Sequence, residues 1–192
     1  MCKHADQTEE FIHHLLENVY PCLELKLQNA IHCVYLKEYD EEHKDYLLEL
    51  MQNLRNDFSS LVTCEQKLVF PSVMKVFNAK SAKEVPLPNL FDLMQLTRSK
   101  EHKIMSHVHN LTSLLDTNTF KNGAIKQHDL ADSFNTNFVK EKYRWNKMIE
   151  DRLNSCSCFR SNIFKGLGLD PKTNPLPNKF SFFVICSNCI NF

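Results

Sequence analysis

Glycine is scarce in this sequence, and neither sign of charge is in excess. Only three glycines occur among 192 residues, which argues against the glycine-rich turns that hold phosphates in P-loop and Rossmann folds. Lysine plus arginine and aspartate plus glutamate both number 23, so the zero formal net charge predicts no nucleic-acid partner. The motifs G-x-S-x-G and H-E-x-x-H are also missing. No arrangement of nucleophile and base is identifiable, and whether the chain is an enzyme stays open.

Long apolar runs are missing as well. The longest, FFVIC at 182–186, is far shorter than the roughly 20 residues that span a bilayer. The first residues, MCKHADQTEEF, lack the apolar segment of an export signal. We therefore expect a soluble, cytoplasmic protein with no membrane partner. Eight cysteines in such a chain favour free thiols or metal ligands over a disulfide framework.

Helix-favouring residues dominate the rest, and apolar residues recur every three or four positions in four segments, at about 8–36, 41–77, 89–115 and 129–160. Pro21 and Pro71 predict a kink or a break in the first two. Polar stretches at 78–88 and 116–129 predict connections. The sequence therefore predicts an all-α, up-down four-helix bundle over residues 1–167, followed by a short irregular tail with cysteines at 168–192.

A carboxylate continues the apolar stripe of the second segment. That stripe consists of Leu47, Leu50, Met51, Leu54, Phe58 and Leu61. Glu65 follows Leu61 by four residues, in TCEQKLVFPSV, so we expect it to face the core. A buried charge costs several kcal/mol unless it is paired, protonated or bound to a metal. Glu65 therefore predicts a partner inside the bundle.

Several stretches resemble hemerythrin-like domains, in particular the iron-sulfur cluster repair di-iron proteins. EQKLVFPSV (65–73) is similar to the family's E-E-x-x-L-F-P-x-I segment, and HHLLENVYP (13–21) to its His-His pair followed by proline. Weaker similarities extend the resemblance to about residues 8–167. It implies a bundle in which five histidines and two glutamates hold two oxygen-bridged irons. It also implies a role in repairing iron-sulfur clusters after oxidative or nitrosative damage.

Most ligand positions that the resemblance implies carry other residues here. His14, or its neighbour His13, matches the first histidine and Glu65 matches a glutamate, but non-ligating residues stand at further positions: Leu61, Arg98, Ser155 and Phe159. Because leucine and phenylalanine cannot ligate and arginine carries a fixed positive charge, we do not expect a complete two-iron site. We predict instead that Glu65 and Arg98 form a buried structural ion pair that takes the place of the metal.

Two metal sites stay open as alternatives. A reduced site for one iron or zinc ion would use His14, Glu65 and His102, with Glu38 as a further donor. A zinc site would use four thiolates from CSC and CSNC, namely Cys156, Cys158, Cys186 and Cys189. Scattered free thiols are the simpler interpretation of these cysteines.

Two functions of different classes are consistent with these features. The first is a hemerythrin-like stress-response protein related to iron-sulfur cluster repair, with a degenerate iron site. The second is a non-catalytic bundle that serves as a binding or scaffold module for an unidentified protein, with a homodimer among the options. The first requires a bound metal and the second does not.

Overall fold

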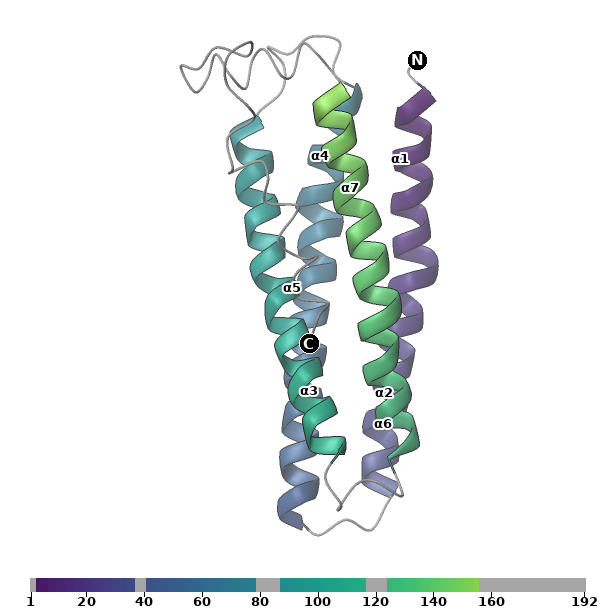
Figure 1. The fold of residues 1–192 in the computed structure, drawn as a ribbon, viewed down its shortest axis with the longest axis vertical. Helices are drawn as coiled ribbons and strands as arrows, with labels where there is room; N and C mark the ends of the chain where they lie inside the picture. The colour runs from purple at the N-terminus through teal and green to yellow at the C-terminus, as the bar shows by residue number, and fades with distance from the viewer. Residues whose placement is uncertain (1–2, 37–40, 79–86, 117–123, 156–192) are drawn as a thin grey trace.

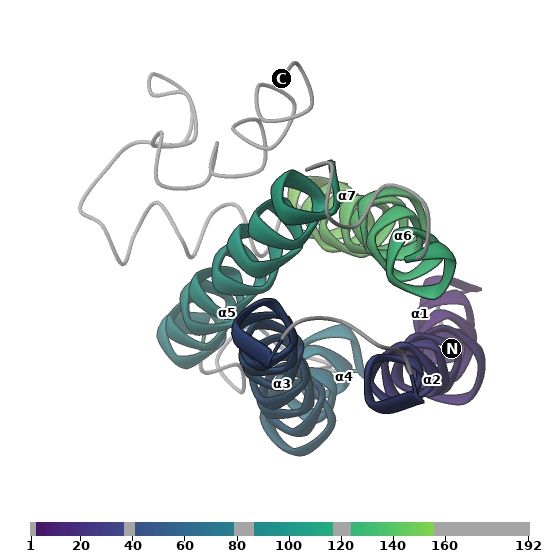
Figure 2. The same cartoon turned by 90° about the horizontal axis from the view of Figure 1, so that it is seen from below.

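The computed structural model describes residues 3–36, 41–78, 87–116 and 124–155, and these form four helical columns that lie side by side (Figure 1). Seen along the columns, they form a ring (Figure 2). The first column consists of α1 (Lys3–His14), η1 (Leu15–Val19) and α2 (Tyr20–Leu36). The second consists of α3 (Glu41–Cys64), η2 (Glu65–Val69) and α4 (Phe70–Asn78). The third is α5 (Leu87–Leu115), and the fourth consists of α6 (Ile125–Ser133), η4 (Phe134–Phe138) and α7 (Val139–Ser155).

The predicted all-helical body with four helical columns is confirmed, and the first three columns end within one residue of the predicted positions. The fourth begins earlier than predicted, at Ile125, within the stretch that we expected to be a connection. A tertiary contact anchors its first turn, because the buried side chain of Gln127 donates a hydrogen bond of 2.9 Å to the backbone oxygen of Ala30. The tail at 168–192 lies outside the described residues.

Apolar side chains from all four columns form the core. All six residues of the stripe predicted on the second segment are buried, as the three- and four-residue spacing requires. Burial of one such leucine or phenylalanine contributes roughly 1.5–3 kcal/mol to folding. The core is therefore the main source of stability, and any polar group inside it needs a partner.

The columns do not break at Pro21 and Pro71. Each proline lies two residues after a π-helical turn, η1 or η2, and the helix continues through it. A proline has no N–H to donate, and its ring clashes with the carbonyl four residues earlier in a regular α-helix. A wider turn directly before the proline takes the place of the expected break. In the first column the buried positions accordingly step by five residues, from Leu15 to Tyr20, and in the second both Val69 and Phe70, four and five residues after Glu65, are buried.

Large apolar side chains are also exposed on several columns. They lie on α2, α3, η2, α5, α6 and α7, and are Leu25, Tyr35, Leu36, Tyr46, Leu68, Leu96, Ile125 and Tyr143. Within the described ranges, no helix combines the length and the apolar character needed to cross a membrane.

Candidate functional site

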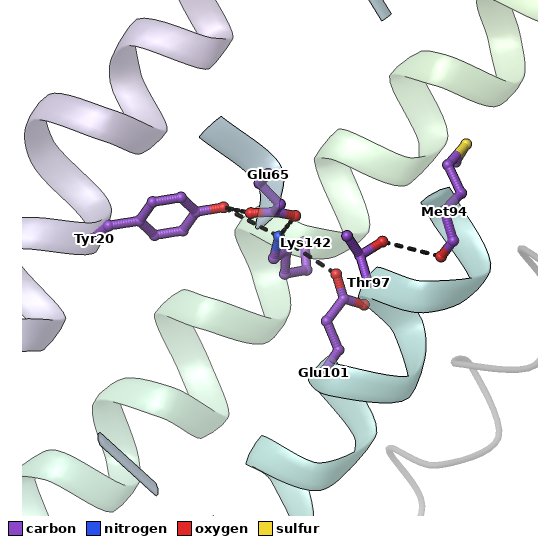
Figure 3. Close-up of polar contacts among 6 residues, drawn as sticks. All are labelled: Tyr20, Glu65, Met94, Thr97, Glu101 and Lys142. Atoms are coloured by element: carbon purple, nitrogen blue, oxygen red, sulfur yellow. Dashed lines mark hydrogen bonds and ion pairs between the residues drawn. The ribbon is translucent and has the colours of Figure 1, made fainter. Parts of the chain in front are cut away.

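A buried polar cluster lies at the centre of the bundle, and each column contributes one side chain to it (Figure 3). The ammonium of Lys142, on α7, donates hydrogen bonds to the carboxylate of Glu65, on η2, and at 3.1 Å to the phenol oxygen of Tyr20, on α2. Tyr20 donates its own hydroxyl proton to the other carboxylate oxygen of Glu65. Glu101, on α5, has Oε1 3.4 Å from Lys142 Nζ. One cation therefore links two carboxylates and a phenol from the three other columns.

Aromatic side chains pack on both sides of this cluster along the bundle. Phe58 precedes Glu65 by seven residues and packs edge-on against the ring of Tyr20, with 5.8 Å between ring centroids. On the other side, Phe70 follows Glu65 and packs edge-on against Trp145 at 5.1 Å. These rings exclude water from both ends of the cluster, and a low local dielectric strengthens each charge interaction inside it.

Burial and neighbouring charge together determine the protonation states of Lys142 and Tyr20. Burial is the largest single influence on Lys142 and acts to lower its pKa, but Glu65, Tyr20 and Glu101 together outweigh burial, and the pKa is raised. The pKa of Tyr20 is raised as well, first by burial and then by the charge of Glu65, which also accepts its proton in a hydrogen bond. Burial raises the pKa of Glu101 too, and Lys142 and Arg98 oppose this shift. Lys142 is therefore an ammonium at neutral pH, and Tyr20 is a neutral phenol.

Three of the four cluster residues lie next to π-helical turns. Glu65 is the first residue of η2, Tyr20 directly follows η1, and Lys142 comes one turn after η4. A π-helical turn contains one more residue than an α-helical turn and changes the direction of the side chains that follow, and such turns are frequent at functional sites. In each of these three columns the π-helical turn and the cluster residue lie within about one helical turn of each other along the chain.

Arg98, the predicted partner of Glu65, is half-buried on α5. The buried side chains of α5 recur in alternating steps of about three and four residues: Leu90, Met94, Thr97, Ile104, Val108, Leu111 and Leu115. This spacing turns Thr97 and Glu101 toward the core. The charge of Arg98 acts to lower the pKa of Glu101 and of Glu150. The cation placed against Glu65 is Lys142, and the pairing with Arg98 stays a prediction.

Three residues of the predicted single-metal site, His14, Glu65 and His102, lie in the described part of the chain. Glu65 is buried, whereas His102 is exposed on α5, and His14 on α1 has its Nε2 3.9 Å from Glu141 Oε2. In the part of the chain that the structure describes, no group of three or more histidine, cysteine, aspartate or glutamate side chains is arranged to hold a metal ion. Glu38, the further predicted donor, lies outside that part.

The residues around Glu65 also differ from the donors of the two-iron centre that the resemblance implies. Leu61, at one implied ligand position, is completely buried and apolar. The ammonium of Lys142 lies against the carboxylate that a metal ion would use. A metal cation bound to the same carboxylate would be repelled strongly by this ammonium, because the local dielectric is low. Two carboxylates and a phenol surround that ammonium, rather than a set rich in imidazole. This arrangement does not fit two irons.

The predicted zinc ligands lie outside the described residues: Cys156, Cys158, Cys186 and Cys189. The cysteines within the described ranges, Cys22, Cys33 and Cys64, are free thiols. Burial raises the pKa of the Cys64 thiol, directly before Glu65. A protonated thiol is neither a good nucleophile nor a metal ligand.

Lys142 and Tyr20 are not among the site residues predicted from the sequence. Lys142 follows Phe138 by four residues and precedes Trp145 by three, so it continues an apolar stripe in the way that Glu65 does. That signal was available in the sequence. Tyr20 precedes the buried Leu23 by three residues, so it too continues an apolar stripe, although the step back to the buried Leu15 is five residues.

The fold and cluster thus define an all-helical bundle with an ammonium at its centre. Comparison with protein-family models, with curated proteins and with solved structures gave no match to this chain. The resemblance to hemerythrin-like domains therefore stays a prediction.

Proposed function

We propose that the chain is an up-down, hemerythrin-like bundle that works without a metal, as a binding or scaffold module for a protein partner. The observation that carries the proposal is the ammonium of Lys142 between Glu65 and Glu101. Helical bundles build metal sites from inward carboxylates and imidazoles. In this bundle the carboxylates already have a cation, and that cation is covalently part of the chain.

Displacement of this cation by a metal is unfavourable for two reasons. Lys142 would have to lose its proton or move its charge out of the core, and the raised pKa opposes loss of the proton. Its side chain also lies close to the rings of Tyr20 and Phe138, with Nζ 5.5 and 5.7 Å from their centroids, and such contacts favour the cation further. Both effects support a bundle that folds and functions in its metal-free form.

Metal analysis of protein purified without a histidine tag tests this proposal. We expect iron and zinc far below one atom per chain, a colourless solution, and a thermal midpoint that does not change when EDTA is added. A zinc site in the cysteine-containing tail would change the zinc content, so the Cys156→Ser/Cys158→Ser variant is the matched control. An oxo-iron absorption in the near ultraviolet that disappears in Glu65→Ala contradicts the proposal.

A metal-linked role in the stress response or in iron-sulfur cluster repair is the second candidate. The observation that favours it is the placement of Glu65, which faces the centre of the bundle at a π-helical turn. This candidate requires stoichiometric iron in the native protein. The same measurement therefore separates the two functions, because only one of them survives a negligible iron content.

A further inference from the structure

We propose that the outer face of α2 is the surface through which two copies of this chain pair, with their α2 helices packed antiparallel about a two-fold axis. The assignment rests on the binding role proposed above and deepens it, because it names the surface and the partner. We call this surface the α2 face, and it consists of the exposed residues of α2: Pro21, Cys22, Leu25, Gln28, Asn29, His32, Tyr35 and Leu36.

The α2 face contains no aspartate, glutamate, lysine or arginine, and this sets α2 apart from every other α-helix in the described ranges. Even α1, which precedes it in the same column, exposes Glu9 and Glu10. In place of charge the α2 face carries large apolar side chains, and Leu25, Tyr35 and Leu36 are each more than half exposed. Exposed apolar side chains without charge among them are typical of the centre of a protein interface.

Four residues of the α2 face lie in one line along the helix. Their spacing is four, three and four residues, so at 3.6 residues per turn they stay within about 60° of arc: Leu25, Asn29, His32 and Leu36. A leucine stands at each end of the line and two polar side chains lie in the middle. About a two-fold axis at its centre, Leu25 of one copy meets Leu36 of the other, and Asn29 meets His32, an amide and an imidazole that can hydrogen-bond.

The lack of charge on the α2 face favours a second copy as its occupant. A two-fold interface places a surface against itself, so charged residues near the axis would come close to the same charges. The charged residues beside the face are held by neighbouring columns instead: Glu24 accepts a 3.1 Å hydrogen bond from Arg55 on α3, and Lys26 lies 3.0 Å from Asp129 on α6. A lipid surface or a nucleic acid is bound through lysine and arginine, which this face does not provide.

The size of the α2 face indicates how strong the pairing is. α2 has 17 residues, so it is about 25 Å long. One helix of this length provides an interface at or below the lower end of the roughly 1,200–2,000 Å² that stable complexes bury. We therefore expect a reversible dimer whose population grows with protein concentration.

Sedimentation velocity of the full chain tests the proposal, at concentrations from about 1 to 300 µM and under reducing conditions because Cys22 lies on the same face. We expect the mass to rise from one chain toward two. Leu25→Lys and Leu36→Glu should each weaken the dimer by at least about tenfold, because each places a charge against a leucine in a contact that excludes water. Leu96→Glu is the matched control, since Leu96 is an exposed leucine on α5, across the ring from α2 (Figure 2), and it should leave the dimer unchanged.

The double variant Leu25→Lys/Leu36→Glu tests the antiparallel arrangement. The introduced lysine of one copy meets the introduced glutamate of the other at both ends of the interface, so the dimer should be restored. The two positions are about 16 Å apart along one helix, too far for the new charges to pair within a chain.

A monomer at every concentration overturns the proposal, and the α2 face would then belong to a different protein partner. Equal weakening by Leu96→Glu overturns it too, and so does a double variant that stays monomeric. Stoichiometric iron in the native protein contradicts the metal-free function and does not change the oligomeric state. The two failures are therefore distinguishable.

Discussion

Two of the lysine–carboxylate pairs that join the helical columns, Lys142 with Glu65 and Lys26 with Asp129, differ in their surroundings. Lys142 and Glu65 meet at the centre with 5% and 1% of their side chains exposed. Lys26 on α2 lies 3.0 Å from Asp129 on α6, with 31% and 52% exposed. Water competes for the second pair, and exposed pairs contribute about 0–1 kcal/mol. Breaking a buried pair costs about 3–5 kcal/mol, because it leaves one charge without a partner.

The largest effect is therefore expected from breaking the central pair. Lys142→Met and Glu65→Leu should each lower the free energy of unfolding by about 3–5 kcal/mol. The double variant should recover most of this loss, because replacing both buried charges with apolar groups is often neutral or stabilising. Chemical denaturation of the two single variants and the double variant measures the coupling. Additive losses in the double variant contradict a direct interaction between the two side chains.

A smaller effect is expected from the phenol of the same cluster. Tyr20→Phe removes a hydroxyl that donates to Glu65 and accepts from Lys142, and we expect a loss of about 1–3 kcal/mol. The effect should depend on pH, because the pKa values of Tyr20 and Lys142 are both raised in the folded protein. The stability that these groups contribute is fully present below their unfolded pKa values. It is lost as the pH rises from there toward the folded values.

Unfolding measured between pH 8 and 11 tests that dependence. The unfolded chain releases these protons near pH 10, the ordinary value for tyrosine and lysine, while the folded chain retains them. Stability should therefore fall with rising pH above about pH 10. In Tyr20→Phe the slope should be shallower by about one proton, or about 1.4 kcal/mol per pH unit. An unchanged slope contradicts the assignment of a buried, neutral phenol.

The smallest effect is expected at the exposed pair. Lys26→Met should change the free energy of unfolding by no more than about 1 kcal/mol, since water replaces much of what Asp129 loses. Lys26 also donates a 2.7 Å hydrogen bond to Ser133 Oγ, so a small loss is expected rather than none. High salt should reduce even this difference, because screening acts on exposed charges and hardly reaches the core. Equal losses in Lys26→Met and Lys142→Met would remove the distinction between the two pairs.

The sequence predicted those parts of this arrangement that depend on regular helical spacing. The stripe from Leu47 to Leu61 and the inward position of Glu65 follow from steps of three and four residues, and both are observed. The four columns follow from the same periodicity. What such spacing predicts is the side of each helix that faces the core.

The composition of the cluster was harder to predict, because it depends on how the columns are placed relative to one another. A search for metal ligands directs attention to histidine and glutamate, and therefore passes over Lys142. Three π-helical turns also change the phase of their columns within five residues, so Leu15 and Tyr20 share one face at a spacing that a regular helix does not allow. On α5, a small difference in the period of the apolar stripe decides whether Arg98, or instead Thr97 and Glu101, faces the core.

The π-helical turns have a consequence for the history of the chain. Deleting one residue from a regular helix turns everything that follows by about 100° and takes the apolar stripe out of the core. In η1, by contrast, the inward positions Leu15 and Tyr20 are five residues apart, and loss of one residue between them leaves the four-residue step of an ordinary α-helix. Such a turn is a place where the chain can gain or lose a single residue and still keep both halves of a long helix facing the same interior.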